Sequence, residues 1–212
     1  MNALKINKIQ GIETLADEAL VTTLKDCCPT HKVGCVNWEE FPYTPDVNFR
    51  IACSDKALAL MFEVKEDHVR AEAMEDNGPV WEDSCVEFFV MSPDGKHYTN
   101  FEMNCIGTLL AAFRTGRHDA EHFDIGKMSQ IRRITSLPHA KTDSSAEGQT
   151  WWAVEVIPFS LMGYETAPAK LKANIYKCGD KCSRPHFLSW SPIALAQPDF
   201  HCPDFFGEMT IA

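Results

Sequence analysis

Several features are missing from this sequence of 212 residues, and each absence excludes a class of protein. There is no run of eighteen apolar residues, so we expect no membrane-spanning helix. There is no cluster of Lys or Arg either. The sequence has 20 basic and 30 acidic residues, and its formal net charge is −10. An acidic surface repels phosphate groups, so we expect no nucleic-acid partner and no binding to anionic membranes. A neutral ligand suits this charge better.

The cysteines lack the regular spacing of a disulfide framework or of a structural zinc site. Nine are present, an odd number that cannot all pair, and several lie in apolar runs where a free thiol packs as a small hydrophobic group. The first ten residues, MNALKINKIQ, lack the apolar stretch of a signal peptide. These features favour reduced thiols in a reducing, cytoplasmic compartment. Zinc binding stays open as an alternative for two groups, which are Cys27, Cys28, His31 and Cys35, and Cys178, Cys182, His186, His201 and Cys202.

Repeats and linkers are also absent, so we expect one domain over residues 1–212. Short apolar runs of strand length, separated by turn residues, fill most of the chain. They cover residues 47–54, 58–64, 85–91, 98–105, 107–113, 130–136, 151–157, 171–178 and 208–211. Such spacing predicts an all-β fold, a two-sheet antiparallel sandwich of immunoglobulin-like or jelly-roll-like type. A helix over residues 15–24 and a helical turn over 158–163 are the few helical elements expected.

Alternation within the strands separates a core face from a polar face. Over residues 98–105, Phe101 and Met103 point to the expected core. The opposite face carries Asn100, Glu102 and Asn104, side chains that hydrogen-bond well to hydroxyl groups. This polar face is either the solvated side of a strand or a surface for a ligand rich in hydroxyls. Glu87 stands among apolar residues, where a carboxylate needs a hydrogen-bonding partner or a nearby cleft.

Two adjacent tryptophans follow the same alternation. By period two, one of Trp151 and Trp152 must face away from the core. We assign Trp152 to the core, together with Val154 and Val156. Trp190 is also expected to be structural.

Six segments together resemble family 9 carbohydrate-binding modules. Residues 80–89 read VWEDSCVEFF, similar to the signature strand of that family, and NFEMNCIGTLL follows from residue 100. The closing segment, DFHCPDFFGEMTI over residues 199–211, is similar to the end of these modules. Further likenesses are WAVEVIP (152–158), ANIYKCGD (173–180) and HFLSWSP (186–192). The order and spacing of the segments cover roughly residue 47 to the C-terminus.

The resemblance implies a DOMON-like β-sandwich that binds sugar without cutting it. Modules of this family often accompany xylanases and other glycoside hydrolases, which implies a role in the breakdown of plant-type polysaccharides and a periplasmic or secreted location. Some hold structural calcium in acidic loops, for which Asp46, Asp83 and Asp94 are the candidates here. A carbohydrate ligand and a monomer or weak oligomer are expected.

The resemblance also assigns roles to individual residues. Trp81 takes the position of the first of two aromatic rings that enclose a sugar, and Phe200 that of the second. Glu87 takes the position of a carboxylate that binds hydroxyls. Further polar contacts are expected from Asn100, Glu102, Asn104 and His201. Two departures concern the ligand: in xylanase-borne members the position of Glu102 is basic, and the second ring is Trp rather than Phe.

Other interpretations remain. Trp81 and Phe200 could pack in the protein rather than against a ligand. Glu87 and Glu102, on neighbouring strands, could serve as the two carboxyl groups of a glycoside hydrolase, which stand about 5–10 Å apart. A heme-binding or protein-interaction domain of DOMON-like type is the third alternative.

Overall fold

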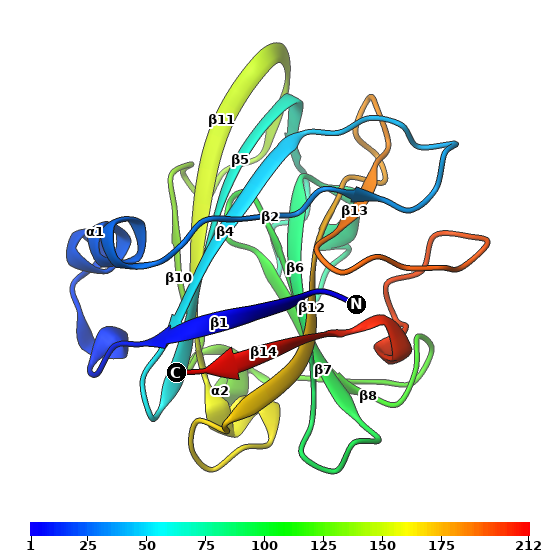
Figure 1. Ribbon diagram of the computed structural model, residues 1–212. Coiled ribbons are helices and arrows are strands. Elements are labelled where there is room, and N and C mark those ends of the chain that lie inside the picture. Colours follow the sequence, from blue (N-terminus) through cyan, green and yellow to red (C-terminus); the bar gives the residue numbers. More distant parts are fainter.

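The computed structural model describes residues 1–212. The protein consists of two layers of strands packed face to face (Figure 1). The strands of the first layer lie in the order β10 (Arg132–Thr135), β11 (Thr142–Pro158), β5 (Ala57–Ala71), β4 (Asp46–Cys53) and β1 (Ala3–Lys8). The second layer continues through β14 (Gly207–Ile211), β12 (Lys170–Cys178), β6 (Cys85–Met91), β7 (Tyr98–Asn104), β8 (Leu109–Arg114) and β9 (Ala120–His122). Three short strands lie beside these layers: β2 (His31–Lys32), β3 (Cys35–Val36) and β13 (Phe187–Ser189). The predicted all-β sandwich is confirmed.

Helices are few and short. They are α1 (Asp17–Cys27), α2 (Ile125–Met128) and the single 3₁₀ turns η1 (Ile12–Thr14), η2 (Val80–Glu82), η3 (Phe159–Met162) and η4 (Pro203–Phe205). The expected helix over 15–24 corresponds to α1, and the expected turn after Pro158 to η3. None of the helices combines the length and the apolar character needed to cross a lipid bilayer.

Strand β1 joins the two layers and was not predicted. Its first four residues pair in parallel with β14, where Leu4 lies opposite Met209, and its last two residues pair in parallel with β4. All other strand pairs are antiparallel. Only two apolar residues, Leu4 and Ile6, alternate in this strand and both are buried. Such a short pattern is too weak to predict a strand.

The main core lies between the layers. It contains 36 buried residues, among them Phe49 and Phe62 from the first layer and Phe88 and Phe101 from the second. Met103 also belongs to it, as the alternation predicts. At roughly 25 cal/mol per Å² of apolar surface removed from water, this cluster is the principal source of stability.

Strands β5 and β11 extend beyond the predicted runs as a long antiparallel ribbon, which Figure 1 shows as the longest pair of the first layer. Residues 142–145 of β11 pair with residues 68–71 of β5. The register shifts at a β-bulge between Ser145 and Gln149, and pairing with β5 resumes from Gln149 onward. Residues 142–150 contain no apolar alternation, so the sequence pattern does not predict this part of the strand. Backbone pairing with β5 and a contact of 2.6 Å between His68 Nε2 and Asp143 Oδ1 hold it in place.

The assignment of the adjacent tryptophans needs correction. Trp151 lies in the main core, where its indole Nε1 donates a 2.6 Å hydrogen bond to Glu66. Trp152 is half-buried on the outer side of β11, next to Val154 and Val156. Those two valines are buried as expected, but in a separate cluster with α1. Both faces of β11 are therefore covered, and alternation alone cannot tell the larger core from the smaller one.

The second layer is likewise covered on its outer face. Phe89, Tyr98 and Tyr176 point outward from β6, β7 and β12 and are buried by aromatic side chains from loops, including Trp38 and Phe200. The polar face of β7 is also buried. It is therefore not the solvated side of a strand, since Asn100 and Asn104 are hydrogen-bonded to other residues of the protein.

One buried carboxyl group has no partner and makes stability depend on pH. Glu155, on the core side of β11 with Ala153 and Ile157, is 1% exposed, and neither of its oxygens is hydrogen-bonded. Burial raises its pKa to about 8 from the ordinary value of 4.5. Since the unfolded chain ionises first, the free energy of unfolding falls as pH rises from 4.5 towards 8.

We therefore expect Glu155→Gln to be more stable than the wild type at pH 8, by an amount on the order of 2 kcal/mol, and the advantage to shrink at pH 5. Urea unfolding at the two pH values measures the difference. An equal dependence on pH in both proteins would show that Glu155 does not titrate in this way.

Candidate functional site

A cleft of about 250 Å³ opens on the outer face of the second layer. Five of the sugar-binding residues expected from the sequence line it: Trp81, Glu87, Glu102, Phe200 and His201. The other lining residues are Arg114, Arg117, His118, Cys178, Asp180, Phe187, Pro198 and Asp199. The strands supply the floor of the cleft, and η2 and the loop before η4 supply its walls.

Two carboxyl groups stand side by side in the cleft. Glu87 of β6 and Glu102 of β7 are direct cross-strand partners and are 3% and 4% exposed. Burial is the main cause that raises the pKa of both groups, to about 7 for Glu102. The charge of Glu102 raises the pKa of Glu87 further. Both groups are thus costly to ionise when the cleft is empty, and a ligand that donates hydrogen bonds would stabilise the ionised form.

Each carboxyl group is held by a neighbour. The Cys178 thiol of β12 donates a 3.0 Å hydrogen bond to Glu87 Oε1. Asn100 Nδ2 donates to Glu102 Oε1 at 2.7 Å, and Asn100 Oδ1 accepts from Arg114 Nε at 2.7 Å. Asn100 does not line the cleft. Its amide is used inside the protein, where it orients both Glu102 and Arg114.

Trp81 is the exposed aromatic group of the cleft. It lies in η2, and 38% of its surface is accessible. Neighbouring backbone fixes this turn, since Asp180 N donates to Trp81 O at 3.2 Å and Lys181 N donates to Glu82 O at 3.0 Å. A Lys181–Glu82 ion pair of 2.8 Å adds a further link. The indole is therefore presented by a fixed turn, and packing in the main core is not its role.

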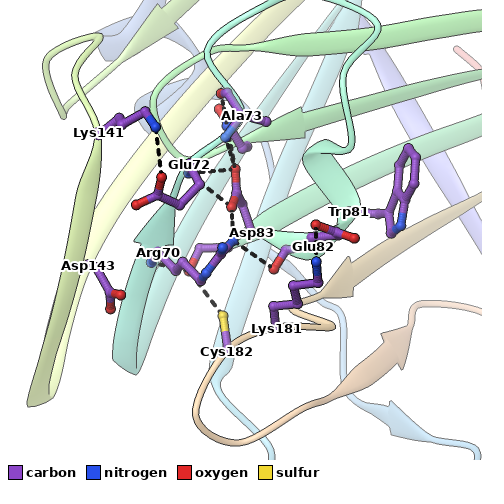
Figure 2. Close-up of polar contacts among 12 residues, drawn as sticks. Arg70, Glu72, Ala73, Trp81, Glu82, Asp83, Lys141, Asp143, Lys181 and Cys182 are labelled. Atoms are coloured by element: carbon purple, nitrogen blue, oxygen red, sulfur yellow. Dashed lines mark hydrogen bonds and ion pairs between the residues drawn. The ribbon is translucent and has the colours of Figure 1, made fainter.

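The buried carboxylate of Asp83 anchors that turn from the inside (Figure 2). It forms an ion pair with Arg70 and accepts hydrogen bonds of 3.0 Å from the backbone N–H groups of Glu72 and Ala73. Asn104 Nδ2 donates to it as well, at 3.0 Å. Figure 2 shows the contacts from Arg70, Glu72 and Ala73 converging on Asp83 while the Trp81 side chain points away from them. Asp83 is thus a structural anchor and is not available to a calcium ion.

Asn104 belongs to this anchor and does not line the cleft. Its Nδ2 also donates to Ala73 O at 2.9 Å, and its Oδ1 accepts from the backbone of Ile106 and Thr108. Every hydrogen-bonding group of the amide is occupied. A contact between Asn104 and a ligand is thus not part of the geometry, although the sequence suggested one.

Phe200 and His201 form the opposite wall. The Phe200 ring is stacked on Tyr176, with centroids 4.2 Å apart and planes 6° apart, and it is only 8% exposed. One of its faces is thus occupied by the protein. His201 Nδ1 lies 2.9 Å from Tyr98 Oη. Burial lowers the pKa of His201 to about 3, so its ring is neutral.

Sequence reasoning missed the basic side of the cleft. Arg114 ends β8, a strand that otherwise reads LLAAF, and Arg117 and His118 follow in a loop. A single charged residue at the end of an apolar strand gives no signal for a site. Asp180, by contrast, lies within the ANIYKCGD segment and could have been named from it.

No three residues of either metal-ligand group suggested by the sequence bring their ligand atoms together. His186 Nε2 lies 2.8 Å from Lys177 Nζ, inside the protein, whereas His201 contacts Tyr98. Cys27 is exposed and Cys28 is buried. None of the nine cysteines forms a disulfide. The remaining calcium candidates have other partners: Asp46 pairs with Lys32, and Asp94 with His97 and two backbone N–H groups.

An exposed indole beside buried, hydrogen-bonded carboxyl groups, on the outer face of a β-sandwich, defines a binding domain for a small polar ligand. The chain belongs to carbohydrate-binding family 9, whose model matches residues 17–211. The resemblance noted in the sequence is thereby confirmed. No curated protein sequence matches the chain.

Solved structures support the same family. A candidate carbohydrate-binding protein from Bacteroides uniformis shares 38% identity over 99% of both chains, with a TM-score of 0.93. A family 9 module from Caldicellulosiruptor kristjanssonii, solved with glucose, has a TM-score of 0.62 at 12% identity and covers 100% of this chain and 96% of its own. A structure of a family 9 module from the same organism with cellotriose has a TM-score of 0.61 at 12% identity, covering 99% of this chain and 93% of its own. At 12% identity the likeness concerns the fold alone.

Proposed function

We propose that the cleft binds a sugar unit, with one face of the ring stacked on Trp81 and its hydroxyls bonded to Glu87 and Glu102. The observation that carries the proposal is the exposed indole fixed beside two buried carboxyl groups. Sugars present apolar C–H faces and hydroxyl donors together, and few other small ligands match both surfaces. Carboxylates accept strong hydrogen bonds from hydroxyls.

The wall formed by Phe200 and His201 offers a ligand less aromatic surface than Trp81 does. Because one face of Phe200 is already stacked on Tyr176, Phe200 can offer only its remaining surface. His201, being neutral, adds a hydrogen-bonding ring nitrogen at the same wall. Asn100 contributes indirectly by holding Glu102. A cleft of about 250 Å³ lies below the size of typical drug-binding pockets, about 300–1,000 Å³, which favours one or two sugar units.

The geometry favours binding over hydrolysis. A glycoside hydrolase places its two carboxyl groups on either side of the scissile bond, one as acid and the other as base or nucleophile. Glu87 and Glu102 instead project from the same face of neighbouring strands, directly opposite each other in the register. A sugar above the sheet would meet both from one side. We therefore propose a non-catalytic module.

The net charge and the solved relatives support a neutral sugar as the ligand. The family 9 modules from Caldicellulosiruptor kristjanssonii were solved with glucose and cellotriose, which are neutral. A net charge of −10 agrees with a neutral ligand. We propose glucose- or xylose-containing oligosaccharides of plant-type polysaccharides as ligands, in support of their breakdown.

Calorimetric titration with gluco- and xylo-oligosaccharides tests the proposal. We expect modest affinity, and a loss of at least about tenfold in Glu87→Gln, since a hydrogen bond to a charged group is worth about 1.5–3 kcal/mol. Glu121→Gln, on the exposed strand β9, is the matched control and should leave the affinity unchanged.

Incubation of the wild type with aryl glycosides separates binding from hydrolysis. We expect no turnover. Turnover that disappears in Glu87→Gln would instead establish the hydrolase alternative.

A further inference from the structure

A group of possible metal ligands lies at the floor of the cleft. The thiol groups of Cys85 and Cys178 and the carboxyl group of Glu87 place their ligand atoms within 4.8 Å of one another. No other group of three Cys, His, Asp or Glu residues in the chain meets this condition. Of the cysteines in the zinc-like sequence groups, only Cys178 is part of it.

The strand register explains why the three groups converge. Cys85 and Cys178 are direct partners across β6 and β12, so their side chains leave the same face side by side. Glu87 follows Cys85 by two residues on β6, and period two returns it to that face. The next residues on this face are aromatic, Phe89 on β6 and Tyr176 on β12, so the site is confined to one end of the sheet.

The protein places no basic group in direct contact with the Glu87 carboxyl group. Two other fully buried carboxylates have basic partners, Asp83 with Arg70 and Glu66 with Lys177. Glu87 has no Lys, Arg or His nitrogen within 4.0 Å, and its recorded hydrogen bond comes from a thiol. A cation bound in place of the thiol proton would place a positive charge beside this carboxyl group and favour its ionised form.

We propose that Cys85, Glu87 and Cys178 bind a thiophilic divalent cation, Zn²⁺ or its analogue Cd²⁺, with the fourth position open to the cleft. Zinc takes four ligands in a tetrahedron, with sulfur at about 2.3 Å, which sets two sulfurs about 3.8 Å apart. Atoms within 4.8 Å of one another reach this geometry by a shift of about 1 Å. Glu87 and Cys178 line the cleft, so an ion can enter and a water molecule can complete the shell. Binding releases the thiol protons to solvent.

Cadmium titration of the reduced protein, followed by the ultraviolet thiolate-to-cadmium absorption band, tests the site. The titration uses a background variant, Cys27→Ser with Cys35→Ser and Cys202→Ser, which removes the thiols that are exposed or half-buried. We expect one Cd²⁺ per chain in this background, and zinc should displace it. Adding Cys85→Ser or Cys178→Ser should abolish stoichiometric binding and the band.

Two more variants keep the test decisive. Glu87→Gln retains both thiols and should weaken binding while keeping a thiolate band. Cys105→Ser, a buried thiol of the main core, should change neither. Circular dichroism checks the fold of each variant. Absence of a band in the background variant, or a band that survives Cys178→Ser, would overturn the proposal. Since no sugar is used, the result is independent of the proposed function.

Discussion

Replacing Asp83 by Ala is expected to lower the free energy of unfolding by about 3–5 kcal/mol, the cost of removing one partner of a buried ion pair. The Asp83 carboxylate is fully buried and pairs with Arg70. It also accepts hydrogen bonds from two backbone N–H groups and from Asn104. The variant would leave a charge and several donors without partners. Urea unfolding of the variant and the wild type measures the loss.

Two comparisons make this result specific. Asp204→Ala, an exposed acidic residue in η4, should change stability by no more than about 0.5 kcal/mol. In Arg70→Met, the further replacement of Asp83 by Ala should cost clearly less than it does in the wild type, because the ion pair is already broken. A loss below about 1 kcal/mol in the single Asp83 variant would contradict its role as the anchor of η2.

Replacing Trp81 by Ala should weaken sugar binding at least tenfold and leave stability almost unchanged. An aromatic ring contributes about 0.5–1.5 kcal/mol beyond area burial, and the area lost adds to this. Because the indole is 38% exposed and points away from the Asp83 anchor, the fold does not depend on it. Calorimetric titration measures the affinity, and thermal unfolding measures the stability.

Trp81→Phe keeps a ring at this position and should retain part of the affinity. Ile125→Ala, which removes an exposed apolar side chain of α2 outside the cleft, should bind as the wild type does. A large loss of stability in Trp81→Ala, with little change in affinity, would instead identify Trp81 as a packing residue.

The fold could be predicted where apolar residues alternate over a full strand. Residues 85–91 coincide with β6, and the run over 98–105 differs from β7 by one residue. The alternation also assigned Phe101 and Met103 to the core correctly. Strand β1 and the polar half of β11 were missed because pairing with other strands, and not their own pattern, determines them.

The site was predictable to the level of which residues share a face. Glu87 and Glu102 were expected on neighbouring strands, and they are direct partners. What covers a face cannot be derived from alternation, so Asn104 was expected near a ligand although its amide is fully used inside the protein. Arg114 was missed because its strand is otherwise apolar. Loop positions, such as that of Phe200 against Tyr176, depend on packing between distant segments.

A glycan array probed with the wild type and with Trp81→Ala in parallel tests the sugar-binding proposal most directly. We predict that the wild type binds neutral oligosaccharides that contain glucose or xylose, and that the signal is lost in the variant. Binding of equal strength and pattern by both proteins, or no binding to any sugar by the wild type, would contradict it.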